Sequence, residues 1–490
     1  MLVRLVAALA ARESASLALC PPPRRRLLRC VLCARRPETT SAEAATSTTT
    51  CPTTTSPPAP SGRLPKRKVA LLLGYNGAKY WGFQIQSATP EFTTVESELQ
   101  KALAASGVVS RQNAEKLSKC GWSRSARTDK GVSAARSLVT VKLEMAESES
   151  LDSAIARVNA ELPPDIRVFD AVRVTKGFEA KRACDRRRYA YLLPECLLAS
   201  PAQVEAIFGR HLSTDVETLR EHIIASKSRG EKTTPSLWRV QDSAVREAVA
   251  KDLAAFRADP AVVQALQRFL RAYVGTRSFH NFTARMRAGD PKAKRFVLSF
   301  DVDNGVFVSF SSDDDDDQKS PRWLRLTVVG QSFILHQIRK MVAVAAEAAR
   351  RGRVGDDDDA AKALLDGLCD TKHEIPLQLV PGEGLYLGEP IFQAYNQYKA
   401  PPDRQLHWDA SHPKYAAIEA FRTDVVEGAI LQDGSPAALL PFLDYLWQVA
   451  IYGFRLAPDD PLPSCNLGPA ELAEALLRGD GDGDDDDDSR

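Results

Sequence analysis

Apolar positions recur along the chain at two spacings, which predict both strands and helices. An aliphatic run at 69–73 predicts a strand, and an alternation at 138–143 predicts another. Between them, apolar residues from 95 to 103 recur every three or four positions and predict a helix. Thr93 and Glu96 have the spacing of a capping box, so this helix is expected to begin there.

The same two spacings continue through most of the chain. They predict a helix at 151–162 that Pro163 and Pro164 end, strands at 166–174, 186–193, 295–310 and 323–329, and helices at 332–351, 415–425 and 438–451. Strands and helices therefore alternate in two blocks, around 66–194 and around 295–395. This pattern predicts an α+β protein in which two lobes share one sheet.

Composition divides the chain into segments with different expected roles. Residues 1–62 are expected to be a disordered arm and residues 456–490 an acidic disordered tail. The two lobes are expected at 63–199 and 266–396. A polar helical insertion at 200–265 would separate the lobes, and a helical extension at 397–455 would follow them.

The arm at 1–62 has the composition of a targeting segment. It is rich in Ser and carries eight Arg against three Glu. Such a composition is typical of an organelle transit peptide, which predicts a mitochondrial or chloroplast protein. The alternative is an unstructured basic arm of a nuclear protein.

The small net charge conceals a basic body. The 490 residues include 65 Lys and Arg against 63 Asp and Glu, but 16 of the acids lie in the Asp-rich runs at 313–317, 356–359 and 480–488. An excess of positive charge therefore remains elsewhere, as expected of a protein that binds a polyanion. The Asp-rich runs are expected to be solvated loops and part of the tail.

The sequence also excludes several classes of protein. No apolar run approaches the ~18 residues that a membrane span needs. The nine Cys form no paired framework and the seven His no cluster at ligand spacing, so a reducing compartment and no metal site are expected. No phosphate-binding loop or dinucleotide fingerprint is present, and no cofactor is expected.

The segment SARTDKGVSA carries the most informative chemistry. Asp129 lies there on a turn that Gly131 makes possible, and three cations flank it, namely Arg124, Arg127 and Lys130. These cations are expected to hold the pKa of the Asp129 carboxyl below its usual range. An ionised carboxylate of this kind suits nucleophilic or electrostatic work at a sugar carbon. Taken alone, the residues favour an Asp that caps a turn and pairs with Arg127.

Six segments together resemble one family. In chain order they read LLLGYNGAKYWGFQIQ (71–86), ARTDKGVSA (126–134), FEAKRACDRRRYAYLL (178–193), VGTRSFHNFT (274–283), GQSFILHQIRKMV (330–342) and GEGLYL (382–387). Their content and order resemble the tRNA pseudouridine synthase A family, in its eukaryotic branch. The resemblance covers roughly residues 66–396 and includes that family's catalytic Asp motif.

The resemblance implies roles for four residues. Asp129 would be the nucleophile, and Arg127 would help to extrude the target nucleotide. Tyr189 would lie against the uracil, and Arg339 would pair with the Asp. The residues themselves are less specific, because Tyr191 fits a stacking role equally well and the helical pattern predicts a surface position for Arg339.

The resemblance also implies a fold and a reaction. The fold would have two α/β lobes that share a largely antiparallel sheet, with helices outside and a central basic cleft. The reaction would be isomerisation of uridine to pseudouridine in tRNA after base flipping, without a cofactor or metal. His280 and His336 would be structural or face RNA, because this chemistry requires no His.

Two alternatives stay open at this point. The protein could perform the same chemistry mainly on messenger or small nuclear RNA, or it could bind tRNA with little catalysis. The resemblance leaves the oligomeric state open, and it implies no membrane partner.

Overall fold

The computed structural model of the chain describes residues 64–86, 92–212, 218, 221, 243–284, 286–308, 320–457 and 460. The predicted arm at 1–62, the Asp-rich run at 313–317 and nearly all of the predicted tail lie outside the described residues. So does most of the middle of the predicted insertion. Every described element belongs to the unit that comprises residues 63–490.

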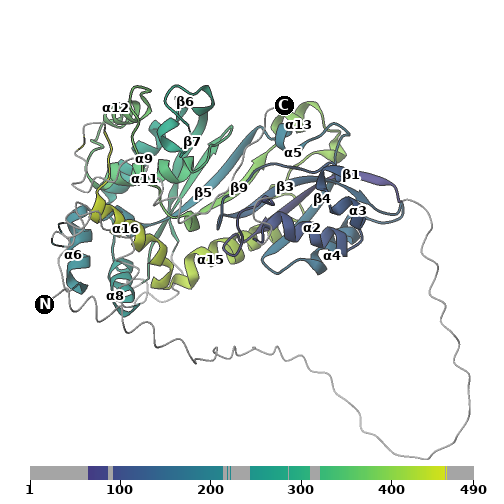
Figure 1. Ribbon diagram of the computed structural model, residues 1–490, viewed down its shortest axis with the longest axis horizontal. Coiled ribbons are helices and arrows are strands. Elements are labelled where there is room, and N and C mark those ends of the chain that lie inside the picture. Colours follow the sequence, from purple (N-terminus) through teal and green to yellow (C-terminus); the bar gives the residue numbers. More distant parts are fainter. Residues whose placement is uncertain are drawn as a thin grey trace, which may run out of the picture. The chain divides into compact units, whose positions relative to one another are not determined.

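A nine-stranded sheet organises the described part of the chain (Figure 1). Its strands are, in chain order, β1 (Lys66–Tyr75), β2 (Ser123–Arg124), β3 (Ser133–Glu144), β4 (Ile166–Arg173), β5 (Arg186–Pro194), β6 (Gly275–Ser278), β7 (Lys294–Val308), β8 (Trp323–Gly330) and β9 (Leu385–Ile391). The spatial order is β4-β1-β3-β9-β5-β8-β7-β6, with β2 paired to β3 beside this path. Each of the six predicted strands is present; β3 begins at Ser133 rather than at residue 138, and residues 309–310 lie outside the described ranges.

The sheet consists of two antiparallel halves joined at a short parallel seam. β4, β1, β2 and β3 form the first half, and β9, β5, β8, β7 and β6 form the second. At the seam, β3 and β9 run parallel with only two registered pairs, Ser133 with Tyr386 and Ala134 with Leu387. The predicted α+β fold, with two lobes on one largely antiparallel sheet, is confirmed.

Helices surround this sheet. They are α2 (Val95–Ala105), α3 (Arg111–Ala114), α4 (Leu151–Glu161), α5 (Ala180–Ala183), α6 (Pro201–His211), α8 (Ser243–Ala254), α9 (Pro260–Ala272), α11 (Gln337–Arg350), α12 (Asp358–Cys369), α13 (Gln393–Tyr398), α14 (Tyr415–Phe421), α15 (Gly428–Leu431) and α16 (Leu440–Tyr452). A π-helical segment at Arg422–Glu427 joins α14 to α15. Figure 1 shows α2 and α4 beside the first half of the sheet and α9, α11 and α12 beside the second. No helix in the described ranges is long and apolar enough to cross a membrane.

Alternation along β1 produces a hydrophobic core on each face of the first half. Val69, Leu71 and Leu73 belong to the core that includes the buried faces of α2 and α4. Ala70 and Leu72 belong to a second core. That core also contains Phe392 and Tyr395 from the end of the second lobe, and Leu406, Trp408 and Ile418 from the C-terminal extension. The extension therefore covers the face of the sheet opposite to α2 and α4.

The cap of α2 differs from the predicted one. The capping box consists of Thr94 and Ser97, since the Ser97 amide donates to Thr94 Oγ1 (3.1 Å) and the Thr94 amide donates to Ser97 Oγ (3.0 Å). The prediction of Thr93 and Glu96 was wrong by one position. Glu96 is buried and accepts from Arg124 Nε (2.9 Å), so its carboxylate is engaged away from the helix end.

The start of α11 also differs from its prediction. The helix begins at Gln337 rather than at residue 332. His336 has a φ of 63°, in the left-handed region, which interrupts helical geometry immediately before Gln337. Residues 331–336 therefore form a loop, in which Ile334 is buried.

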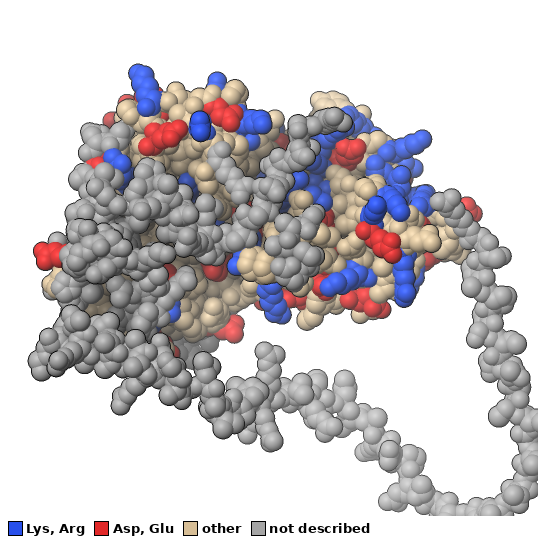
Figure 2. Space-filling view, viewed as in Figure 1, with Lys and Arg blue, Asp and Glu red and all other residues tan. Residues whose placement is uncertain are grey.

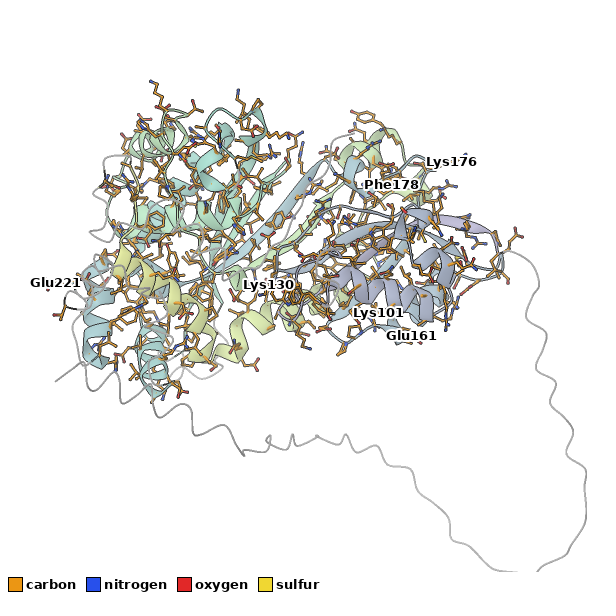
Figure 3. The ribbon with its side chains drawn as sticks, viewed as in Figure 1. Lys101, Lys130, Glu161, Lys176, Phe178 and Glu221 are labelled. Atoms are coloured by element: carbon orange, nitrogen blue, oxygen red, sulfur yellow. The ribbon has the colours of Figure 1, made fainter. Side chains whose placement is uncertain are left out.

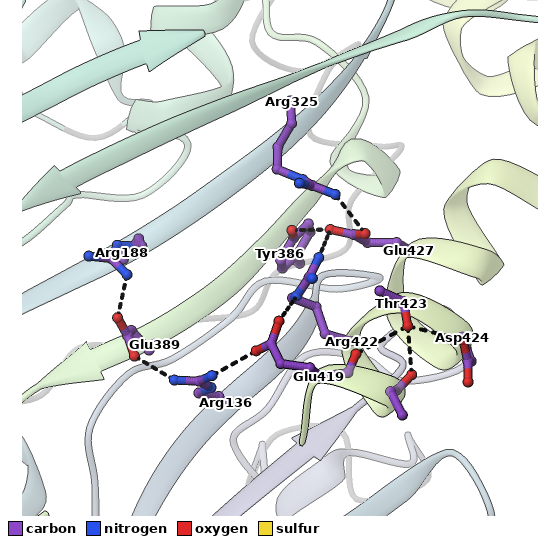
Figure 4. Close-up of polar contacts among 11 residues, drawn as sticks. Arg136, Arg188, Arg325, Tyr386, Glu389, Glu419, Arg422, Thr423, Asp424 and Glu427 are labelled. Carbon is purple, nitrogen blue, oxygen red and sulfur yellow. Dashed lines mark hydrogen bonds and ion pairs between the residues drawn. The ribbon is translucent and has the colours of Figure 1, made fainter. Parts of the chain in front are cut away.

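A ladder of alternating Arg and Glu side chains crosses the seam and reaches the C-terminal extension (Figure 4). Arg136 on β3 pairs with Glu389 on β9 (2.9 Å) and with Glu419 on α14 (2.7 Å). The ladder continues on both sides of this centre. We call its seven members the ion-pair ladder: Arg188, Glu389, Arg136, Glu419, Arg422, Glu427 and Arg325. It connects both halves of the sheet to the extension.

Candidate active site

Asp129 lies on a tight turn between β2 and β3. The Val132 amide donates to Asp129 O (3.1 Å), and Gly131 has a φ of 78°, which favours glycine. The start of the loop is fixed by a pair of bonds between Ser125 and Leu138, from the Ser125 amide to Leu138 O (2.8 Å) and from the Leu138 amide to Ser125 Oγ (3.1 Å). The turn is therefore the one predicted from Gly131.

The strand and turn at 71–86 hold this loop from the side. The Tyr75 hydroxyl forms a hydrogen bond with Thr128 Oγ1 (2.9 Å), and the Phe83 amide donates to Thr128 O (3.1 Å). Gly82 has a φ of 82°, and a Cβ at this position would lie 2.9 Å from Thr128 O. The segments 71–86 and 126–134, which only the family resemblance connects in the sequence, therefore contact each other directly. The contact requires glycine at position 82.

Two of the three cations that flank Asp129 in sequence bind other groups. Arg124 pairs with the buried Glu96 (2.7 Å). Lys130 Nζ lies 3.5 Å from the centre of the Trp81 ring, and Figure 3 places Lys130 where the two halves of the sheet meet. Arg124 and Lys130 thus each have a contact besides any with Asp129, and the effect of the three cations on the pKa of Asp129 stays a prediction.

A cavity of about 700 Å³ opens beside the loop, and we call it the Asp129 cavity. Its wall brings together the four residues predicted for the site, Asp129, Arg127, Tyr189 and Arg339. Among the described residues of this wall, Asp129 is the only carboxylate. Six cations share the wall with it: Arg124, Arg127, Lys181, Arg187, Arg295 and Arg339. The predicted basic cleft thus surrounds a single acid.

Tyr189 is buried in β5 with its ring against another aromatic side chain. The ring centres of Tyr189 and Phe333 lie 5.5 Å apart, in an edge-to-face arrangement. Burial raises the pKa of Tyr189 well above its usual range; Arg187 opposes this shift, and the charge of Asp129 adds to it. The phenol is therefore neutral at physiological pH, and its pKa depends on the charge of Asp129.

Tyr191 does not share this position, although the sequence alone fits it equally well. Its hydroxyl donates to Pro381 O (2.8 Å), away from the described wall of the Asp129 cavity. Gly384 packs directly against the Tyr191 ring, where a Cβ would lie 2.8 Å from the ring carbon Cζ. Tyr189 is accordingly the tyrosine of this strand that faces the cavity.

Arg339 lies in the first turn of α11 and is only 8% exposed. Its Nε donates to Val380 O (2.8 Å), and a Cβ at Gly382 would lie 3.5 Å from the guanidinium carbon. Helical periodicity alone predicted a surface Arg, which was wrong. The burial follows from packing against the 380–382 turn, which is distant in sequence.

Lys340, the next residue, joins two of the segments that carry the resemblance. Its Nζ donates to Asn281 O (3.3 Å) and to Thr283 O (3.2 Å), which ties α11 to the 274–283 segment. Burial lowers the pKa of Lys340 to about 8. This lysine is a structural cation beneath the site, and the sequence analysis did not identify it.

The two histidines near the motifs occupy different environments. His280 is buried, with Nδ1 3.3 Å from Ser278 Oγ and Nε2 3.0 Å from His373 O. His336 lies in the wall of the Asp129 cavity. Across the described residues, no group of three or more His, Cys, Asp or Glu is arranged to hold a metal ion.

Arg187 is a site residue that the sequence analysis missed. Its Nε and one terminal nitrogen donate to Ser125 O (2.9 and 2.7 Å), and the other terminal nitrogen donates to Gln331 O (2.8 Å). Arg187 thus joins the Asp129 loop to the 331–336 loop. Strand alternation places it on the same face of β5 as Tyr189, and that signal could have identified it.

Comparison with known proteins connects this geometry to a family. A family model described as tRNA pseudouridine synthase matches residues 269–393. The tRNA pseudouridine(27/28) synthase of Saccharomyces cerevisiae is 32% identical over 341 residues, which cover 66% of this chain and 84% of the relative.

Two further relatives are longer than this chain. The tRNA pseudouridine synthase 1 of Candida glabrata is 30% identical over 370 residues, covering 68% of this chain and 62% of the relative. The pseudouridylate synthase 1 homolog of Mus musculus is 30% identical over 339 residues, covering 69% of this chain and 64% of the relative. The chain therefore spans less than two thirds of the length of these two relatives.

Proposed function

The chain belongs to the tRNA pseudouridine synthase family, and we propose that it isomerises uridines of tRNA to pseudouridine. The observation that carries this proposal is the Asp129 cavity, in which one carboxylate shares a wall with six cations and a buried tyrosine. A positive cavity suits an RNA substrate, and a lone acid suits attack at a sugar carbon. The wall residues at 332–339 lie within the region that matches the family model.

Access to the uracil requires extrusion of the nucleotide from its stack, at a cost of a few kcal/mol. Arg127 would fill the vacated place, and the ring of Tyr189 would lie against the extruded base. Arg339 would pair with Asp129 and orient its carboxylate. Since these three side chains come from different elements, the sheet and α11 must both be in place before the site is complete.

The reaction rearranges bonds within one nucleotide. The N1–C1′ bond breaks, the uracil turns in the cavity, and C5 bonds to C1′. Asp129 would either add to C1′ or assist removal of the 2′ proton to give a glycal. Neither route changes the oxidation state, so the residues of the chain suffice for the chemistry.

The proton on C5 must leave in the last step. A neutral phenol accepts a proton only if it releases its own, so Tyr189 would serve as a relay, through water if needed. The raised pKa of Tyr189 agrees with this role rather than with a resident phenolate. The negative charge of Asp129 would restrain the ring from losing its proton before the base has turned.

The test is the substitution Asp129→Asn, which removes the charge and keeps the shape. We expect tRNA binding to persist while pseudouridine formation, mapped after incubation with tRNA, falls below detection. Asp358→Asn, on the exposed start of α12, is the matched control and should behave as the parent chain. Product formation by Asp129→Asn at the parental rate would contradict the assignment.

The compartment is a separate part of the proposal. We propose that residues 1–62 direct the protein to the mitochondrion or chloroplast, on the basis of their Arg- and Ser-rich, acid-poor composition. A fluorescent protein fused after residue 62 should enter the organelle. Accumulation of the fusion in the nucleus would favour the alternative of a basic nuclear arm.

A further inference from the structure

A second cavity, of about 1140 Å³, adjoins the Asp129 cavity. The two share Trp122, Ser123 and Lys181 in their walls, so they are neighbours around the end of β2. The second cavity is formed by the outer ends of β1, β3 and β4 together with α5. We call it the basic groove, and its charged members are Lys66, Arg67, Lys68, Lys142, Arg173, Lys176, Glu179, Lys181, Arg182 and Arg404.

The charge of the basic groove is almost entirely positive. Nine Lys and Arg line it against Glu179 as the one acid among its described residues. Figure 2 shows Lys and Arg gathered over the end of the body that carries β1 and α5, and Figure 3 places Lys176 at its outer margin. Lys142, Arg173 and Lys176 are exposed, and none has an ion-pair partner among the described residues.

The arrangement within the sheet opposes folding stability. Lys68 on β1 lies directly opposite Lys142 on β3. Burial has the largest effect and lowers the pKa of Lys68, Glu179 opposes that shift, and Lys142 adds to the lowering. Like charges directly opposite across strands destabilise a sheet. The next pair on the same face, Lys66 with Glu144, shows the ordinary arrangement of opposite charges (3.1 Å). The groove therefore maintains a repulsion that an external anion would relieve.

The arginines that line a third cavity, unlike most cations of the basic groove, are all ion-paired. This cavity has a volume of about 820 Å³ and is lined by Arg188 and Ala190, which point to the face of β5 opposite from Tyr189. Its four arginines all belong to the ion-pair ladder, where each pairs with at least one of the three glutamates. In the basic groove, by contrast, Lys66, Arg182 and Arg404 have ion-pair partners, whereas six of its nine cations have none among the described residues: Arg67, Lys68, Lys142, Arg173, Lys176 and Lys181.

We infer that the basic groove binds the phosphate backbone of the RNA that flanks the extruded nucleotide. This inference rests on the proposed function, since the groove continues from the cavity in which that nucleotide would react. Phosphates at regular spacing along a strand match a row of exposed Lys and Arg better than a single small anion does. The contacts would position the RNA without reading its sequence.

The experiment compares the full chain with a triple variant, Lys142→Gln, Arg173→Gln and Lys176→Gln. Binding of labelled tRNA is measured by fluorescence anisotropy across a range of salt concentrations. We expect the affinity to fall at least about tenfold, and the slope of log Kd against log salt to fall by about 2 to 3, since each phosphate contact contributes about 0.9. The tRNA concentration needed for half-maximal rate should rise in parallel.

A matched control removes the same charge elsewhere. Lys251→Gln, Lys372→Gln and Lys399→Gln together change three exposed lysines outside the described walls of all three cavities, and they should leave affinity and slope unchanged. Equal losses in both triple variants, or no loss in the groove variant, would overturn the inference. Groove-dependent binding to anionic lipid vesicles but not to tRNA would also overturn it.

These measurements distinguish failure of the groove inference from failure of the proposed function. If the parent chain binds tRNA through the groove but forms no pseudouridine, the proposed function fails and the groove stands. If the parent forms pseudouridine and the groove variant binds tRNA as the control does, the reverse holds.

Discussion

At the scale of single residues, the site depends on side chains whose protonation the fold controls. Tyr189 is held neutral by burial, beside the only carboxylate among the described residues of the cavity wall. In the proposed reaction its hydroxyl and its ring would serve different purposes: the ring, which contacts Phe333, would also contact the uracil, and the hydroxyl would transfer a proton. A substitution that separates the two is therefore informative.

Tyr189→Phe removes the hydroxyl and keeps the ring. We expect tRNA affinity to be retained and the single-turnover rate to fall by about 10²- to 10⁴-fold, the usual contribution of a positioned acid or base. Tyr191→Phe is the matched control, because it removes a hydrogen bond to Pro381 O outside the cavity. It should cost about 1 kcal/mol of stability with little effect on rate. A parental rate for Tyr189→Phe would exclude the hydroxyl from the reaction.

The lowered pKa of Lys340 predicts that the free energy of unfolding depends on pH. This pKa is about 8 in the folded protein against 10.5 ordinarily, so between these values the unfolded chain binds more protons at this residue. The free energy of unfolding therefore rises with pH in that window, by up to about 3 kcal/mol relative to Lys340→Met, and is flat below it. Denaturant unfolding at both ends of the window measures the difference.

The control for Lys340 is Lys251→Met, at an exposed position on α8. Its difference from the parent should not change with pH. A pH-independent difference for Lys340→Met would show that the lysine is not perturbed in the folded state. The two hydrogen bonds to carbonyl groups, which Met cannot make, contribute a constant offset only.

At the scale of elements, the Asp129 loop is positioned by the turn that follows β1. The turn approaches the loop backbone so closely that Gly82 has no room for a side chain. The loop geometry is therefore imposed from outside the segment 125–134 that contains Asp129. Residues that never touch the substrate would still control the rate.

Gly82→Ala tests this dependence. The positive φ costs about 1 to 2 kcal/mol for any residue with a Cβ, and the added carbon, 2.9 Å from Thr128 O, must displace the loop. We expect at least a tenfold loss of rate with tRNA binding kept. Gly177→Ala, where a Cβ meets nothing within 4 Å, should change neither rate nor stability appreciably. Equal behaviour of the two variants would mean that the loop is not held by this contact.

At the scale of the whole described body, the two halves of the sheet carry different parts of the site. Asp129 and Arg127 belong to the first half, whereas Tyr189 and the 331–339 segment belong to the second. The seam between the halves has two registered pairs. The ion-pair ladder crosses that seam, so it would keep the two parts of the site in register.

Arg136→Gln removes the centre of the ladder. Arg136 is largely buried and pairs with Glu389 and Glu419, so its loss should cost about 2 kcal/mol or more of stability. The rate should fall as well, although the residue lies outside the described wall of the Asp129 cavity. Arg271→Gln breaks the exposed pair with Asp301 and should cost under about 1 kcal/mol. Denaturant unfolding and single-turnover rates decide between these outcomes.

Local patterns predicted the strands well and the buried ionic groups poorly. Apolar runs and alternation depend on one segment and its exposure, so β1, β3 and β5 were found from the sequence. The burial of Arg339 depends on the turn at 380–382, and the displaced cap of α2 depends on the partners of Glu96. Such partners are far apart in sequence, and only the resemblance indicated that Arg339 belongs to the site.

The position of Trp81 has a practical consequence. Its indole lies between the Phe92 ring, stacked at 3.9 Å, and the Lys130 ammonium at 3.5 Å, and Lys130 is the neighbour of Asp129 in the chain. Indole emission is sensitive to a nearby charge, so any shift of the loop when RNA arrives would alter the fluorescence of this residue. A change in Trp81 fluorescence on addition of tRNA would therefore report RNA binding at the Asp129 loop without an added label.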